Sequence, residues 1–139
     1  MTGPILLIET DVVLSAVIGE VLRQHGYEVM FLRSLSLKRE ALHSPPLSAV
    51  IVDIDTLSEE KELALVELLQ QYGESLPIVL MGLQIPDGLC QRLRARLHKG
   101  QVKNMTTWLQ KPFRNEDLLA AIRQVQESYR FPPSPVQQQ

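Results

Sequence analysis

Residues 48–53 read Ser48-Ala-Val-Ile-Val-Asp53, an apolar run that ends in an aspartate. A short run without alternating polar residues is typical of a strand that is buried on both faces, as in a parallel sheet. Two other segments have the same character, Pro4-Ile-Leu-Leu-Ile8 and Leu76-Pro-Ile-Val-Leu-Met81. We therefore predict a parallel sheet that contains these three segments as strands.

Segments with helical periodicity alternate with these runs. Over residues 12–25 the apolar side chains recur at intervals of three and four, the spacing of one face of a helix, and Gly26 follows as a left-handed cap. The pattern predicts strands over 4–8, 27–32, 48–53, 76–81 and 105–110, and helices over 12–25, 34–42, 57–72, 87–98 and 115–129, with Asp11, Asp87 and Asn115 as N-caps. This alternation predicts a doubly wound α/β fold, a parallel sheet with helices on both faces.

Length and composition restrict the class of protein. The chain has 139 residues, of which 45% are hydrophobic and 22% are charged, enough for one domain with an apolar core. Its formal charge of −2 offers no basic surface for direct nucleic acid binding, and no apolar run is long enough to cross a membrane. A single cysteine excludes an internal disulfide. We expect a cytoplasmic domain over residues 4–129, followed by a Pro/Gln-rich disordered tail or linker over 130–139.

Acidic residues follow the first and third predicted strands. Glu9-Thr10-Asp11 comes directly after the first strand, and the third ends in Asp53-Ile-Asp55. Because the carboxyl ends of parallel strands form the working edge of such sheets, we expect Glu9, Asp11 and Asp53 to converge there. Clustered carboxylates raise one another's pKa unless a cation neutralises them, and Mg²⁺ suits oxygen ligands of this kind. Lys111, after the fifth strand, would add a positive charge that can pair with Asp53 or with a phosphoryl group.

The arrangement resembles the receiver domain of two-component response regulators. The resemblance covers roughly residues 5–125 and rests on the order and spacing of Ile5-Leu-Leu-Ile-Glu-Thr-Asp11, Ala49-Val-Ile-Val-Asp53, Leu76-Pro-Ile-Val-Leu80 and Trp108-Leu-Gln-Lys-Pro-Phe113. It implies the flavodoxin-like (βα)5 three-layer sandwich, with a five-stranded parallel sheet in the strand order 2-1-3-4-5. Asp53 would then be the phosphoacceptor for a histidine kinase and form an acyl phosphate. The resemblance also implies an acidic Mg²⁺ site that includes Glu9, Asp53 and the main-chain carbonyl of Asp55, and a cis peptide bond before Pro112.

Three positions depart from the family's pattern. Thr10 stands where the family has the second acid of its metal-binding pair, and Asp11 is either a shifted metal ligand or the N-cap of the first helix. Met81 stands where we expect the Thr or Ser of the switch, and a thioether cannot donate the hydrogen bond of a hydroxyl. Trp108 is bulkier than the usual Tyr or Phe. We therefore predict weak Mg²⁺ binding at best and a degenerate switch at Met81 and Trp108.

These departures lead to two main hypotheses. The first is an atypical receiver that acts as a protein–protein interaction module with impaired phosphorylation switching, and is not an enzyme. Its partner is a histidine kinase or another signalling protein, or a second copy that pairs through the face made by 87–98, 105–110 and 115–129. The alternative is a competent phosphoacceptor that catalyses at most its own phosphorylation and dephosphorylation at Asp53. A flavodoxin-like cofactor binder is disfavoured, because the acidic loop 9–11 lacks glycine and repels a phosphate.

Overall fold

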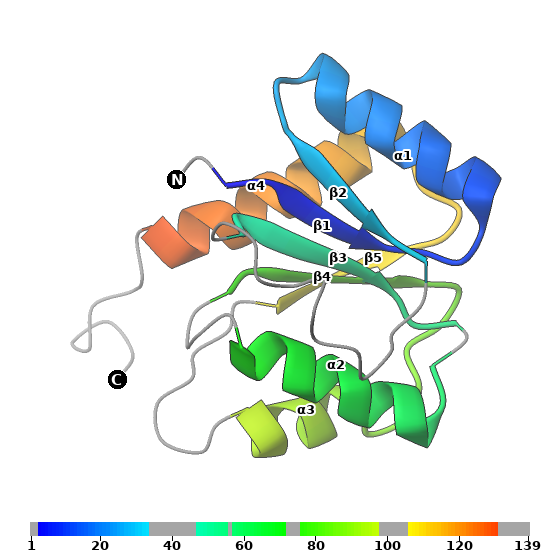
Figure 1. Cartoon of the computed structure of the whole chain (residues 1–139), viewed down its shortest axis with the longest axis vertical. Helices are drawn as coiled ribbons and strands as arrows, with labels where there is room; N and C mark the ends of the chain where they lie inside the picture. Colours follow the sequence, from blue (N-terminus) through cyan, green and yellow to red (C-terminus); the bar gives the residue numbers. More distant parts are fainter. Residues whose placement is uncertain (1–2, 34–46, 56, 72–75, 98–105, 131–139) are drawn as a thin grey trace.

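A five-stranded parallel sheet forms the middle layer of the protein (Figure 1). This computed structural model describes residues 3–33, 47–55, 57–71, 76–97 and 106–130. The strands are β1 (Ile5–Ile8), β2 (Val29–Leu32), β3 (Ala49–Asp53), β4 (Ile78–Gly82) and β5 (Thr106–Gln110). Their order is β2-β1-β3-β4-β5, and every neighbouring pair is parallel. The predicted flavodoxin-like topology is confirmed.

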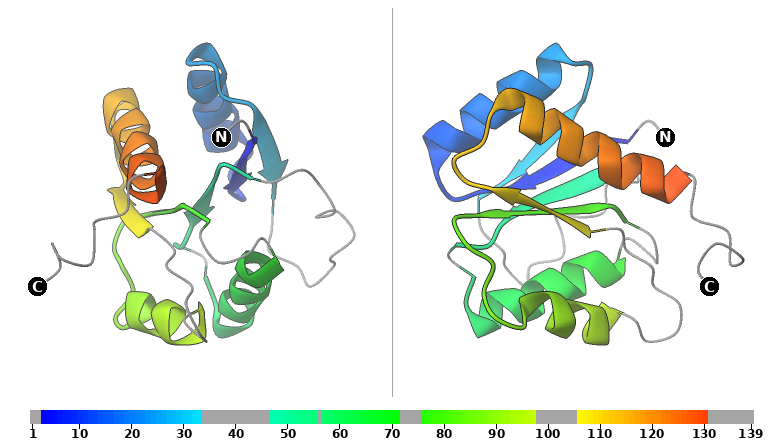
Figure 2. Two further views of the ribbon diagram at one scale, coloured as in Figure 1. Left: turned by 90° about the vertical axis from the view of Figure 1, so that its left-hand side faces the viewer. Right: turned by 180° about the vertical axis from the view of Figure 1, so that it is seen from behind.

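Helices cover both faces of this sheet (Figure 2). One face carries α1 (Val12–Gln24) and α4 (Asn115–Arg130), and the other carries α2 (Glu59–Gln71) and α3 (Leu89–Leu97). In the part of the chain that the structure describes, no helix has the length and apolar character needed to cross a membrane. The helix predicted over 34–42 and most of the predicted tail, from residue 131 on, lie outside the described residues.

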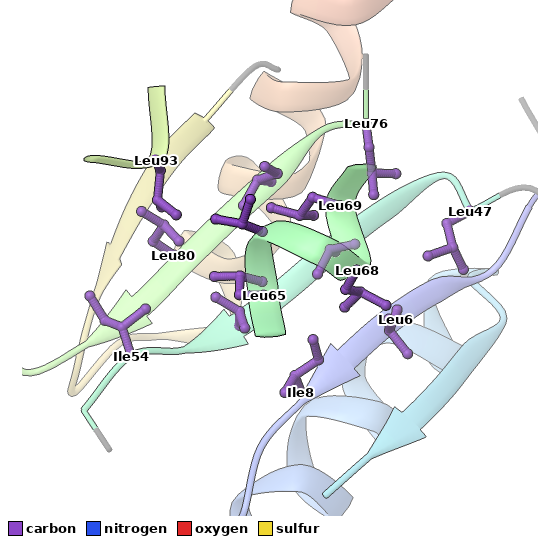
Figure 3. Packing of buried hydrophobic residues seen from close by; sticks show 14 of the residues in the cluster. Leu6, Ile8, Leu47, Ile54, Leu65, Leu68, Leu69, Leu76, Leu80 and Leu93 are labelled. Carbon is purple, nitrogen blue, oxygen red and sulfur yellow. The ribbon is translucent and has the colours of Figure 1, made fainter. Parts of the chain in front are cut away.

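Two hydrophobic clusters hold the three layers together. Successive strand residues point to opposite faces, so Leu6 and Ile8 pack with α2 and α3, whereas Ile5 and Leu7 pack with α1 and α4. Figure 3 shows the first cluster, in which leucines of α2 lie against side chains of β1, β3 and β4. Burial on both faces explains why the strand sequences are continuous apolar runs.

Local hydrogen bonds decide where the helices begin. Asp11 caps α1 as predicted, because its Oδ1 accepts the backbone N–H groups of Val13 at 2.9 Å and Leu14 at 3.1 Å. The predicted cap at Asn115 is wrong. The carbonyl of Arg114 accepts from Leu118, and the Arg114 N–H donates to Asp117 Oδ2 at 3.0 Å, so Arg114 is the cap and Asn115 lies inside α4.

The predicted cap at Asp87 is also wrong. Helix α3 begins at Leu89, and the carbonyl of Gly88 accepts the N–H of Arg92, so Gly88 holds the cap position. Gly88 has a φ of 75°, a left-handed conformation that an aspartate adopts less readily.

Two leucines of α2 test the assignment of its buried face. Leu65 is fully buried in the cluster of Figure 3, whereas Leu63 is 48% exposed on the opposite side of the helix. We expect Leu65→Ala to lower the free energy of unfolding by about 2–5 kcal/mol, because it leaves a cavity. The control Leu63→Ala should cost less than about 1 kcal/mol. Denaturant melts of both variants measure this, and equal losses would contradict the packing of α2.

Candidate functional site

Lys111 lies at the carboxyl edge of the sheet among three carboxylates. Its Nζ is 3.3 Å from Glu9 Oε1, from Asp53 Oδ1 and from Asp55 Oδ2. The backbone fixes this position, because the Lys111 N–H donates to the carbonyl of Gly82 at 2.8 Å. The peptide bond to Pro112 is cis. The loops after β1 and β3 therefore meet the end of β5 at one ammonium group, and three carboxylates share its charge.

The carboxyl groups of Glu9 and Asp53 lie beside this ammonium, and each affects the pKa of the other. Burial first, and then the neighbouring Asp53, raise the pKa of Glu9 to about 7, against the opposing effects of the Asp11 N–H and the charge of Lys111. Burial also acts to raise the pKa of Asp53, but the neighbouring Glu9, the hydrogen bond from the Asp55 N–H and the charge of Lys111 hold it below its ordinary value. At neutral pH Asp53 is therefore ionised, and Glu9 carries a proton for much of the time.

Asp11 and Thr10 lie outside this cluster. The carboxylate of Asp11 is committed to the N-terminus of α1, while its backbone N–H donates to Glu9 Oε2 at 3.3 Å. Asp11 thus takes the role of the helix cap and is not one of the carboxylates around Lys111. Thr10 is exposed. The edge therefore has one buried acid from the loop after β1, Glu9.

Met81 and Trp108 lie on opposite faces of the sheet. Met81 is fully buried in the cluster under α1 and α4, whereas Trp108 packs against the cluster under α2 and α3. The two residues predicted to occupy the degenerate switch positions therefore do not share a face, because alternation along β4 turns the Met81 side chain away from Trp108. The next residue, Gly82, has the parity of Leu80, which belongs to the cluster that Trp108 contacts. Position 82 therefore lies on the same face of the sheet as Trp108, beside Gln110 of β5, and it carries no side chain.

The side chain of Asp55 is part of the site, although sequence reasoning assigned a role only to its main-chain carbonyl. Asp55 Oδ1 accepts the backbone N–H of Leu83 at 2.8 Å, and Oδ2 contacts Lys111. Its own N–H donates to Asp53 Oδ1 at 2.9 Å. The sequence signal that points to this arrangement is the glycine at position 82, which leaves room for a neighbouring side chain.

A bidentate ion pair joins α2 to α3 and was also missed. Arg92 Nε donates to Glu62 Oε1 at 3.0 Å and to Oε2 at 3.1 Å, and another guanidinium nitrogen donates to the carbonyl of Asp87. Glu62 is buried. The two residues are thirty positions apart, and no local pattern pairs them. The contact ties the start of α3 to α2.

Comparisons with known proteins agree with this geometry at the level of the fold. No family model and no curated protein matches the chain. Solved structures do match. The CheY-like response regulator receiver domain protein from Methanospirillum hungatei JF-1 is 14% identical with a TM-score of 0.72, over 94% of this chain and 98% of that chain. The signal receiver domain of an HD domain-containing protein from Pseudomonas fluorescens Pf-5 is 22% identical with a TM-score of 0.71, over the same shares.

A third structure, the chemotaxis protein CheY4 of Vibrio cholerae, is 17% identical with a TM-score of 0.67, over 90% of this chain and 99% of that chain. The chain has the fold of a receiver domain. At these identities the likeness is one of fold.

The residues at the edge of this receiver fold suit Mg²⁺ poorly. Glu9 and Asp53 offer carboxylate oxygens, the ligands that Mg²⁺ prefers, but both contact Lys111, and the raised pKa of Glu9 favours its neutral form. Asp11 is turned to the helix, and the Asp55 carboxylate is held by Leu83 and Lys111. Among the residues described, no three acidic, histidine or cysteine side chains form a metal-binding group.

The raised pKa of Glu9 makes a testable prediction about stability. Below its ordinary pKa of 4.5, Glu9 is protonated in both the folded and the unfolded chain, and the stability that it contributes is fully present. That contribution is lost as the pH rises through about 7, because only the unfolded chain ionises freely. Glutamine has nearly the shape of a protonated glutamate but cannot ionise. As the pH rises from 5 to 8, we therefore expect the free energy of unfolding of Glu9→Gln to increase by about 2–3 kcal/mol relative to that of the native chain.

Denaturant melts at several pH values measure this gain. Glu20→Gln on the exposed surface of α1 is the control, and its stability should follow that of the native chain at every pH. If the Glu9→Gln and native curves are parallel, Glu9 does not hold a proton in the folded state.

Proposed function

We propose that the chain is an atypical receiver domain that acts as a protein–protein interaction module in two-component-type signalling, with impaired phosphorylation switching. The observation that carries this proposal is the pair of residues at the end of β4. Met81 is buried on the far face of the sheet, and Gly82, on the face of Trp108, has no side chain. Neither residue offers the hydroxyl that would couple a phosphoryl group on Asp53 to Trp108.

Lack of this coupling has a thermodynamic consequence. A ligand shifts a conformational equilibrium only when it contacts two states differently. Without a hydroxyl at position 82, a phosphoryl group on Asp53 has no direct contact that changes with the position of Trp108. The ion pair of Arg92 with Glu62 adds a second restraint, because it ties α3 to α2. We therefore expect the face formed by α3, β5 and α4 to keep one conformation.

The same face has features of a binding surface. A groove of about 450 Å³ runs beside β5 and α4, lined in part by Trp108, Asp117 and Gln124. β5 is an edge strand, so one of its sides lacks a strand neighbour within the described sheet. We propose that a signalling protein such as a histidine kinase, or a second copy of the chain, binds here. A module of this kind would act in the cytoplasm, without direct contact with nucleic acid or a membrane.

The alternative is a competent phosphoacceptor, and the charge state of Asp53 favours it. Asp53 is ionised at neutral pH and lies 3.3 Å from Lys111. In that reaction an Asp53 carboxylate oxygen attacks the phosphorus of a phosphodonor such as phosphoramidate. The new P–O bond forms as the P–N bond breaks, and the nitrogen leaves with the electron pair as ammonia. The lysine ammonium would balance the added negative charge. We expect Mg²⁺ to bind weakly, because Thr10 adds no carboxylate.

One experiment separates these two functions. The protein is incubated with Mg²⁺ and phosphoramidate, and its intact mass is followed. Amide exchange in α3 and β5 is then compared between the treated and the untreated protein. We expect slow or absent modification and unchanged exchange, with Asp53→Asn as the unmodifiable control. A phosphoryl mass increment that is lost in Asp53→Asn, together with a change of exchange in α3 and β5, would replace the proposed function by the alternative.

A further inference from the structure

We infer that the Asp55 carboxylate is a built-in anion that occupies the place beside Asp53 where an added phosphoryl group would find its positive partners. This role rests on the proposed function, since it gives a physical reason for poor phosphorylation of Asp53. The carboxylate bridges two donors: Oδ1 accepts the N–H of Leu83 at 2.8 Å, and Oδ2 lies 3.3 Å from Lys111 Nζ. The same ammonium contacts Asp53 Oδ1.

The loop after β3 holds the Asp55 side chain in this position. The Asp55 N–H donates to Asp53 Oδ1 at 2.9 Å, which fixes the turn between the two aspartates. The preceding residue, Ile54, is buried and donates its own N–H to the carbonyl of Met81. The Asp55 side chain is 23% exposed, so it is partly enclosed at the edge of the sheet. Its position is therefore set by the backbone on both sides.

Occupation of these donors works against a second anion. A phosphoryl group carries more negative charge than a carboxylate and needs hydrogen-bond donors on its oxygens. Of the donors next to Asp53, Lys111 is shared by three carboxylates and the Leu83 N–H is taken by Asp55. A phosphoryl group on Asp53 would have to displace the Asp55 carboxylate or lie against it, and two anions in contact repel each other.

Gly82 is the residue that makes room for this anion. A Cβ at position 82 would lie 2.6 Å from Asp55 Oδ1 and 3.1 Å from Ile54 Cγ1, too close for the present arrangement. Its backbone does not explain the glycine, because the glycines with positive φ in the described chain are Gly26 and Gly88. Space alone requires glycine here. Gly82→Ala should therefore push the carboxylate away, as Asp55→Ala removes it.

Two variants and one control test the role of Asp55. Asp55→Ala and Gly82→Ala both free the Leu83 N–H, by removal or displacement of the carboxylate. Asp11→Asn is the matched control, since it removes a carboxylate from the same edge while its amide oxygen can still cap α1. The first measurement, without phosphodonor, is amide exchange at Leu83 by NMR. The second is the rate of the phosphoryl mass increment with Mg²⁺ and phosphoramidate, with Asp53→Asn added to each variant as a blank.

We expect exchange at Leu83 to be at least tenfold faster in Asp55→Ala and Gly82→Ala, and modification of Asp53 to be at least tenfold faster than in the native chain. Asp11→Asn should match the native chain in both. If Asp55→Ala folds, but its Leu83 exchange and modification rate equal the native values, the role of Asp55 is overturned while the proposed function stands. A fast native modification with altered exchange in α3 would overturn both.

Discussion

The ion contacts of Lys111 are the interaction on which the edge of the sheet depends. Its ammonium contacts carboxylates from the loops after β1 and β3, and its backbone N–H is bonded to the end of β4. Without that charge, Glu9 and Asp53 would face each other in a partly buried site, where repulsion between carboxylates is poorly screened. The pKa of Glu9 is raised first by its burial and then by the neighbouring Asp53, and the charge of Lys111 only partly offsets these effects. The site reduces its negative charge by keeping a proton.

The alternation of β4 decides what this charged edge can do. Because neighbouring residues of a strand face opposite sides, Met81 fills the core under α1 and α4, and Gly82 meets the edge on the side of Trp108. A residue with a hydroxyl at position 82 would have to share its space with the Asp55 carboxylate. Glycine at position 82 therefore has two consequences: the position has no hydroxyl, and the Asp55 carboxylate has room beside it. Both favour a receiver fold that binds partners without switching.

Much of the fold could be predicted from the sequence, because buried parallel strands leave a strong local pattern. The runs that end at Ile8 and Asp53 predicted two strands and the position of the acidic edge, and the place of Lys111 after the fifth strand predicted its pairing with Asp53. The prediction did not place Met81 and Trp108 on opposite faces, because a difference of one residue along a strand moves a side chain to the other face. The contacts of Asp55 with Leu83, and of Arg92 with Glu62, join residues about thirty positions apart, and no local pattern contains them.

The stability of Lys111→Met as a function of pH tests the central claim most directly. Its ammonium, whose pKa the carboxylates raise, is charged at both pH 5 and pH 8, so a pH-dependent loss can arise only from its acidic partners. We expect the substitution to lower the free energy of unfolding by about 2–3 kcal/mol at pH 8, and by clearly less at pH 5, where Glu9 is protonated. Lys61→Met, on α2, should change little at either pH. An equal loss for Lys111→Met at both pH values would contradict the account.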